Sequence, residues 1–322
     1  MPNLLSVRNL KVYFYTTRGT VKAVDGVNFD VPEQATLGLV GESGCGKTTV
    51  GLSIMRLVES PGSIVDGQIF FDEKDLVTLA DEEMRNIRGS SISMIFQDPM
   101  SCLNPVLTVG EQLIEVLTIV RRMQKEQART RAVDLLKLVG IPSPAICITE
   151  YPHQLSGGMR QRVVIAIALA GDPRLIIADE PTTMLDVTVQ RQIIELLKNL
   201  MEQYMISTIL VTHDLGLVAE FCDQVAVMYA GKIVEYGDAL SFFDSPQHAY
   251  TQGLLNCLPK VTTAENRLNI IQGTVPSMID VPKGCRFYPR CPRSMELCRE
   301  NEPEMVQTGP RHHVSCFLYE KE

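Results

Sequence analysis

The sequence lacks any apolar run long enough to cross a membrane as a helix. The longest run, Val163 to Gly171, has about half of the ~20 residues that a spanning helix needs and favours a buried helix instead. The N-terminus lacks the basic stretch and apolar core of a secretory signal. We therefore expect a protein that stays in the cytosol and meets a membrane only through a partner.

The sequence also lacks an excess of basic residues, since its formal net charge is -8. A mildly acidic chain is a poor candidate for non-specific binding to nucleic acid. The 322 residues, of which 45% are hydrophobic and 21% charged, are typical of a soluble globular protein with more than one domain.

Short apolar segments alternate with helical patterns along most of the chain. A sheet that is mostly parallel and covered by helices on both faces gives this pattern, so we predict an α/β fold. The segments predicted as strands of this sheet are 36–40, 92–96, 175–178 and 208–212. Residues 4–15 and a hairpin at 224–237, turning at Ala230-Gly231, are predicted to add antiparallel edges.

A helical pattern at about 98–170 interrupts the strands and predicts an inserted helical subdomain. Beyond residue 258 periodicity disappears and prolines recur. We therefore predict a nucleotide-binding domain over 1–258 and a small, irregular, cysteine-rich module over 259–322.

A glycine-rich segment follows the predicted strand 36–40 and fits the pattern G-x-x-x-x-G-K-[ST]. Glycines let successive backbone N–H groups point at phosphates, and the helix that follows adds its positive end. Lys47 is predicted to reach the β and γ phosphates, and the Thr48 hydroxyl to ligate Mg²⁺. The residues expected to bind nucleotide are Gly41, Glu42, Ser43, Gly44, Cys45, Gly46, Lys47, Thr48 and Thr49.

Polar residues stand at the ends of three further predicted strands. Ligands gather at the carboxyl ends of strands in an open parallel sheet, so we expect these side chains at one edge. Asp179 is predicted to hold Mg²⁺, and Glu180 to act as general base on the attacking water. Gln97 is expected to bind Mg²⁺ or the lytic water, and His213 to contact the γ-phosphate.

Residues 155–162 (LSGGMRQR) resemble the LSGGQ signature of ABC ATPases. The resemblance covers nearly the whole chain: Gln97 matches the Q-loop, residues 181–186 (PTTMLD) the D-loop, and His213 the switch histidine. Phe14 matches the aromatic residue that stacks on adenine, with Tyr13 and Tyr15 as alternatives.

The resemblance implies that two ATPase subunits pair head to tail. ATP would lie between the phosphate loop of one subunit and residues Ser156, Gly157, Gly158 and Arg160 of the other. The implied partners are a second ATPase subunit, two transmembrane permease subunits and, indirectly, an extracytoplasmic binding protein, with no nucleic acid. The implied location is the cytoplasmic face of the cell membrane.

Segments 97–113, 151–163, 178–190, 248–259 and 283–292 are similar to ATP-binding subunits of oligopeptide and dipeptide permeases. The resemblance implies ATP hydrolysis coupled to peptide import. A nickel or other small-solute importer is the alternative cargo class. A soluble ABC ATPase acting on nucleic acid or ribosomes is a third reading, but such proteins usually carry two cassettes or a coiled-coil insertion.

Four of the nine cysteines, Cys285, Cys291, Cys298 and Cys316, lie in the last forty residues. Cytosolic thiols stay reduced, so the group predicts a metal site before disulfides. Four thiolates suit a [4Fe–4S] cluster, which we favour, or zinc. His312 or His313 could replace Cys316, and free cysteines are the remaining alternative.

Overall fold

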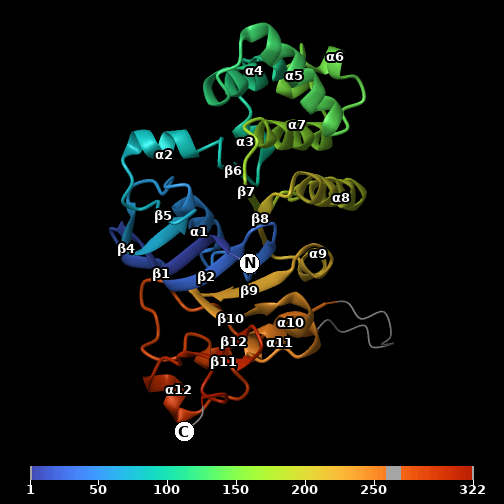
Figure 1. Ribbon diagram of the computed structural model, residues 1–322. Helices are drawn as coiled ribbons and strands as arrows, with labels where there is room; N and C mark the ends of the chain where they lie inside the picture. Colours follow the sequence, from blue (N-terminus) through green and yellow to red (C-terminus); the bar gives the residue numbers. More distant parts are fainter. Residues whose placement is uncertain (1, 259–269, 321–322) are drawn as a thin grey trace. The chain divides into compact units, whose positions relative to one another are not determined.

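The computed structural model describes residues 2–258 and 270–320 (Figure 1). The chain packs into two compact units, described separately here. The first comprises residues 1–4, 31–36 and 74–211, and the second comprises 5–30, 37–73 and 212–322. This division does not follow the predicted domain boundary at 258, which lies beside the undescribed residues 259–269 and stays a prediction.

The first unit contains three parallel strands, β6 (Ile92–Ile95), β7 (Leu175–Asp179) and β8 (Ser207–Thr212). Strand β7 lies between the other two, with Leu175 opposite both Ile92 and Ser207. All of its residues are buried, because helices cover both faces of a parallel sheet. These strands confirm three of the predicted segments.

The chain between β6 and β7 folds into helices, which Figure 1 shows grouped together. Thr108 and Glu111 form a reciprocal capping box at the start of α4. The helices are α3 (Pro99–Cys102), α4 (Val109–Val120), α5 (Lys125–Leu138), α6 (Pro144–Cys147), the 3-10 turn η1 (Pro152–Gln154) and α7 (Gly157–Leu169). The other elements of the first unit are β5 (Lys74–Asp75), α2 (Asp81–Ile87) and α8 (Val187–Tyr204).

In the second unit β3 (Thr36–Val40) pairs in parallel with β9 (Gln224–Tyr229), which turns back into β10 (Lys232–Asp238). The turn falls at Ala230 and Gly231, both with positive φ, as predicted. The antiparallel strands are β1 (Asn3–Thr16), β2 (Gly19–Pro32) and β4 (Gly62–Phe71), in the order β2-β1-β4. The helices are α1 (Lys47–Ile54), α9 (Leu215–Phe221), α10 (Ala239–Asp244) and α11 (Ala249–Asn256).

The C-terminal module is more regular than the sequence suggested. A hairpin of β11 (Met305–Gly309) and β12 (His312–Ser315) pairs with β10, placing Val314 opposite Glu235. The strands are too short and polar for periodicity to reveal them; backbone pairing and the burial of Val314 define them. The other elements are the 3-10 turn η2 (Tyr288–Arg290) and α12 (Glu296–Glu300).

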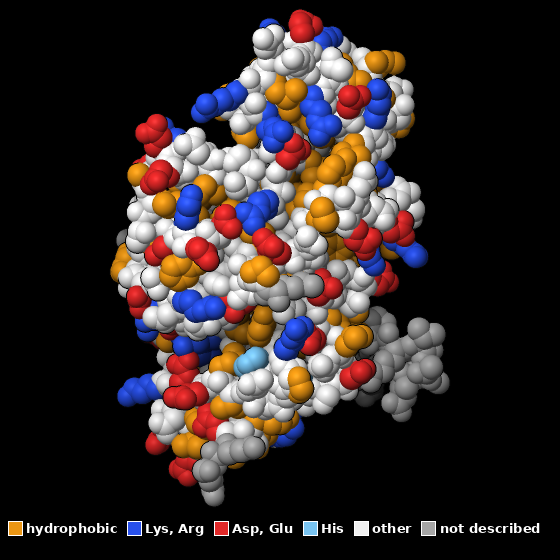
Figure 2. Space-filling view, viewed as in Figure 1, with side chains coloured by type: hydrophobic (Ala, Val, Ile, Leu, Met, Phe, Trp, Pro, Cys, Tyr) orange, Lys and Arg blue, Asp and Glu red, His pale blue; other side chains and the backbone are white. Residues whose placement is uncertain are grey.

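Among the described residues, no helix has the length and apolar character needed to span a membrane. On the face shown in Figure 2, basic and acidic side chains are interspersed.

Candidate functional site

The phosphate loop joins β3 to α1 and requires glycine at two positions. Gly41 and Gly46 have φ values of 154° and 106°. A Cβ added at Gly41 would lie 2.1 Å from the Met228 carbonyl oxygen, and one at Gly46 would lie 2.1 Å from that of Ala23. Both close approaches exclude a side chain, so the fold itself dictates the glycine spacing of the motif.

Lys47 is part of the loop that was predicted to bind the phosphates of the nucleotide. Its side chain is buried, and Nζ donates hydrogen bonds to the carbonyl oxygens of Gly41 at 2.8 Å and Glu42 at 3.0 Å. Ser43, Gly44 and Thr48 are exposed. The loop therefore places a buried ammonium group and the N-terminus of α1 beside a solvent-facing rim, an arrangement suited to a polyphosphate.

The three aromatic residues considered for adenine stacking have different surroundings. The Tyr13 hydroxyl donates to Asp25 at 2.6 Å, and burial together with this bond raises the pKa of Tyr13 to about 12. The Phe14 ring covers Gly62, where an added Cβ would lie 2.5 Å from the ring. Tyr15 is exposed. Phe14 as the stacking residue stays a prediction.

In the first unit, the structure brings the predicted general base and the Q-loop glutamine together. Gln97 Nε2 donates to Glu180 Oε2 at 3.0 Å. The Thr183 hydroxyl donates to the same oxygen at 2.9 Å, a contact that the sequence analysis missed. Asp179 ends β7 and is buried. The backbone N–H of Glu180 bonds the Val211 carbonyl at 2.8 Å, so the backbone that carries this carboxylate is anchored to β8.

His213 belongs to the second unit, where it is exposed directly after β8. The next residue, Asp214, caps α9 by accepting from two backbone N–H groups. The predicted joint roles of Thr48, Gln97 and Asp179 at Mg²⁺, and of His213 at the γ-phosphate, stay predictions.

The signature segment begins α7. The Ser156 hydroxyl caps the helix by accepting from the Met159 N–H at 3.3 Å, and both Ser156 and Gly157 are exposed. A Cβ at Gly157 would meet only Leu185, at an ordinary 3.5 Å. Arg160 is held by a 2.8 Å bond from Nε to the Pro152 carbonyl. This chain's own packing therefore gives no reason for glycine at 157.

The D-loop runs into α8 and exposes a large apolar side chain. Met184 has a φ of 67° and is 83% exposed. Asp186 caps α8 by accepting from the Val189 N–H at 3.0 Å.

The four C-terminal cysteines line one small pocket together with Phe287 and Phe317. However, within residues 2–258 and 270–320 no three His, Cys, Asp or Glu side chains are placed to hold a metal ion. Burial raises the pKa of the Cys285 thiol to about 11 and also raises the pKa values of Cys291 and Cys316. The metal centre at these four cysteines stays a prediction.

Two residues outside the predicted site also contact the phosphate loop. The Glu42 N–H donates to the Tyr250 hydroxyl at 2.9 Å, and Arg290 forms an ion pair with the Glu42 carboxylate. Both lie more than 200 positions along the chain from the loop, beyond the reach of local motif reading.

Comparison with known families gives two matches. Residues 24–183 match the family described as "ABC transporter". Residues 234–298 match the family described as "Oligopeptide/dipeptide transporter, C-terminal region".

Curated relatives align over the whole chain. The oligopeptide transport ATP-binding protein AppD of Bacillus subtilis is 50% identical, with 100% of this chain and 98% of the relative covered. The dipeptide transport ATP-binding protein DppD of the same organism is 50% identical, with 100% and 96% covered.

Solved structures show the same fold. An ATP-binding cassette solved as a dimer in a post-hydrolysis state with ADP and Pi superposes with a TM-score of 0.66 at 30% identity, covering 73% of this chain and 98% of that one. A subunit of the cbiONQ ABC transporter complex of Clostridium perfringens gives a TM-score of 0.64 at 27% identity, covering 76% and 92%.

Proposed function

Because this chain belongs to the ABC transporter family, we propose that it is the ATP-hydrolysing subunit of a membrane importer for peptides. The observation that carries the cargo class is the similarity, at 50% identity over the entire chain, to proteins named for oligopeptide and dipeptide transport. The C-terminal match at 234–298 supports the same class, since that family is described for oligopeptide and dipeptide transporters.

The predicted site residues each take one part in the chemistry of ATP hydrolysis. The phosphate loop binds the phosphates through its N–H groups and Lys47. Thr48, Gln97 and Asp179 supply the oxygen ligands that Mg²⁺ prefers, and the ion neutralises phosphate charge when bound. Glu180, oriented by hydrogen bonds from Gln97 and Thr183, takes a proton from the attacking water.

A second ATPase subunit completes the site in a head-to-tail dimer. Exposed Ser156 and Gly157, whose own packing leaves room for a side chain, support the role of the signature in contacting a partner's nucleotide. The dimer works at the cytoplasmic face of the membrane with two transmembrane permease subunits. An extracytoplasmic peptide-binding protein delivers the cargo, and cycles of closing and reopening drive transport.

The test is ATP hydrolysis by the chain alone and in the assembled transporter in lipid vesicles. We expect low activity alone, and stimulation when the permease subunits and a peptide-loaded binding protein are present. Stimulation by nickel instead of peptides would move the cargo to the alternative class. Full activity of the lone chain, unchanged by the permease, would remove the transport proposal.

We also propose that the four C-terminal cysteines bind a metal centre, with a [4Fe–4S] cluster favoured over zinc. The proposal is supported by their position around a single pocket and by the preference of both centres for thiolates. The measurement is iron, sulfide and zinc content after anaerobic purification, with absorbance near ~400 nm as the sign of a cluster. Stoichiometric zinc without sulfide would select zinc, and no metal would leave free cysteines.

A further inference from the structure

Arg290 extends from the C-terminal segment to the second residue of the phosphate loop. Its guanidinium group forms a two-pronged ion pair with the Glu42 carboxylate, Nη1 to Oε2 at 2.8 Å and Nη2 to Oε1 at 3.0 Å. The Arg290 side chain is 5% exposed and that of Glu42 is 26% exposed. A part-buried, bidentate pair of this kind has a fixed geometry, unlike an exposed pair between flexible side chains.

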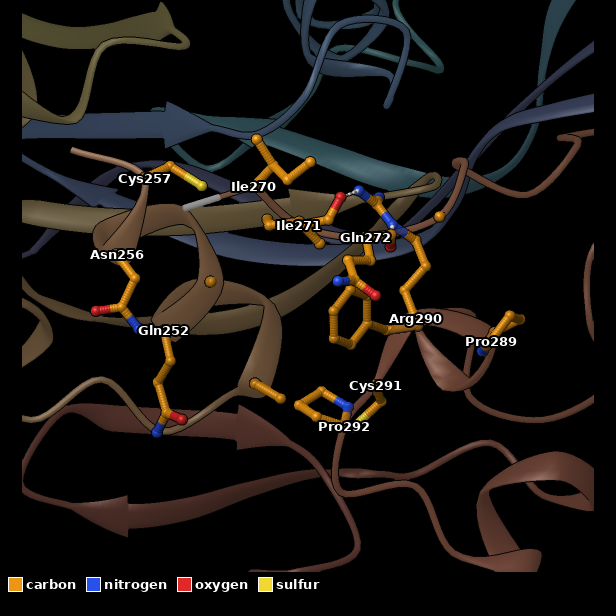
Figure 3. A pocket seen from close by; sticks show the side chains of 14 residues that line it. Gln252, Asn256, Cys257, Ile270, Ile271, Gln272, Pro289, Arg290, Cys291 and Pro292 are labelled. Carbon is orange, nitrogen blue, oxygen red and sulfur yellow. Dashed lines mark hydrogen bonds between the residues drawn. The ribbon is translucent and has the colours of Figure 1, made fainter. Parts of the chain in front are cut away.

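The remaining hydrogen atoms of the guanidinium group are also used. Nε donates to the Gln272 carbonyl at 3.1 Å, Nη2 to that of Ile271 at 3.2 Å, and Nη1 to the Tyr229 hydroxyl at 3.4 Å. Figure 3 shows Arg290 directed at the backbone of Ile271 and Gln272. With the two bonds to Glu42, all five donors of an arginine have acceptors. Lysine has three donors and no fork, so it cannot reproduce this set.

The same contacts leave Arg290 without a donor for a molecule bound in the adjoining cavity. The cavity, of about 780 Å³, is lined by residues of α11, the 270–273 segment and the turn at 287–292. Arg290 is the one charged side chain among the described residues of its lining. Since its donors are already bonded, its charge serves the loop and not a ligand of the cavity.

Glu42 is thereby held from three directions. Its carboxylate accepts from Arg290, its N–H donates to the Tyr250 hydroxyl, and its carbonyl accepts from Lys47. Tyr250 is itself fully buried against Tyr229, with ring centroids 4.6 Å apart. The backbone of the loop is therefore fixed at the residue next to Gly41.

A second arginine of the same segment supports the other side of the loop. Arg286 is buried and bonds both the Asp25 carboxylate and the Ala230 carbonyl. The next residue, Gly231, donates its N–H to the carbonyl of Cys45 in the loop at 2.9 Å. Two arginines four positions apart thus connect residues 286–290 to both halves of the phosphate loop.

We propose that Arg290 is a positioning residue for ATP binding, which holds the phosphate loop in its binding conformation through Glu42. The C-terminal segment is then a working part of the nucleotide site, although it lies outside the 24–183 match to the ABC transporter family. The inference rests on the proposed ATPase function. A loop that is already ordered loses less conformational entropy when ATP binds, so losing Arg290 weakens affinity without touching the reacting atoms.

The experiment is titration of the full-length chain with a fluorescent ATP analogue and Mg²⁺, together with the KM and kcat for ATP. We expect Arg290→Gln to weaken binding and raise KM about tenfold, with kcat at saturating ATP unchanged. Arg290→Lys restores the charge but not the fork, and should weaken binding about threefold. The matched control is Arg293→Gln, because Arg293 is exposed on the same segment and bonds Gln252 at 2.6 Å instead of the loop.

A double-mutant cycle with Glu42→Gln tests whether Arg290 acts on ATP affinity through Glu42. If Arg290 acts through Glu42, the double variant should bind ATP about as weakly as the weaker single variant. Unchanged affinity in Arg290→Gln, or effects that multiply in the double variant, would overturn the inference. Should Arg290→Gln fail to fold, Arg290→Lys and Glu42→Gln provide the same cycle. Failure of the wild-type chain to bind ATP would instead reject the proposed function.

Discussion

The phosphate loop and the signature segment both place glycines at the start of a helix, but the chain supports them differently. In the phosphate loop, carbonyl oxygens of Met228 and Ala23 exclude side chains at Gly41 and Gly46. At the signature, Gly157 is exposed and has room for a Cβ. One segment needs its glycines to fold, whereas the other has a glycine that its own fold does not demand.

This difference indicates that the phosphate loop binds its ligand within its own chain, whereas the signature contacts a ligand held by another subunit. The phosphate loop is anchored within the chain by Lys47, Tyr250 and Arg290, so it is organised before any partner arrives. The signature is held by its helix cap, by the Arg160 contact and by close packing at Gly158, where an added Cβ would lie 2.8 Å from Val189, but Gly157 faces outward. Such a surface suits close approach by a ligand held on another subunit.

The largest expected effect comes from Glu180→Gln. Glutamine keeps the shape of the side chain and can still contact Gln97 and Thr183, but it cannot take a proton. We expect hydrolysis to fall about 10³-fold while ATP binding persists. With hydrolysis blocked, the phosphate loop and a partner's signature should stay joined, so gel filtration with ATP should show a dimer. Continued turnover would remove Glu180 from the base role.

Gly46→Ala tests whether the phosphate loop requires glycine at this position. A side chain here meets both a φ of 106° and the Ala23 carbonyl, so the loop must distort. We expect ATP affinity to fall about 100-fold, measured by titration with the fluorescent analogue. An ATP affinity equal to that of the wild type would show that the loop accepts a side chain at position 46 despite the nearby Ala23 carbonyl.

Gly157→Ala is the matched test of the signature segment. Alanine fits this chain without strain, so the melting temperature and ATP binding of the isolated chain should not change. Hydrolysis in the assembled transporter should fall about tenfold, because the added methyl group displaces the partner's nucleotide. A loss of stability together with unchanged hydrolysis would reverse the comparison.

The sequence predicted those features that depend on local patterns. The strand segments at 36–40, 92–96 and 175–178 were predicted correctly, because the pattern of apolar residues acts within a few positions. The order of the glycine-rich motifs also allowed the family to be identified.

The contacts that support the site were not readable, because they join distant parts of the chain. Arg290 and Glu42 are 248 positions apart, and no periodicity or spacing encodes their pairing. The β11–β12 hairpin was missed for a similar reason, since its two short strands are defined by pairing and not by pattern. The metal centre was inferred from four cysteines within the last forty residues of a chain expected in the cytosol; the structure places all four around one pocket, and the metal stays a prediction.

The last expected effect is on folding stability and concerns the residues that support the phosphate loop. His248 caps α11, the helix that carries Tyr250, and is fully buried. Burial lowers the pKa of His248 from 6.5 to about 4. The charged groups acting on it are Glu235, which accepts from the His248 N–H, and Arg293; Glu235 also bonds His312.

This lowered pKa makes the support sensitive to acid, and His248→Asn should remove that sensitivity. The unfolded chain protonates His248 below pH 6.5 while the folded chain does not, so stability is full above 6.5 and falls as the pH drops toward 4. Wild type should lose about 2 kcal/mol more than His248→Asn between pH 7 and 5, measured by denaturant unfolding. Asparagine retains the helix cap. Exposed His153, changed to Asn, is the control and should follow the wild-type pH dependence. Parallel curves of unfolding free energy against pH for wild type and His248→Asn would show that His248 has the same pKa in the folded and unfolded chain. The loss of stability in acid would then come from other residues.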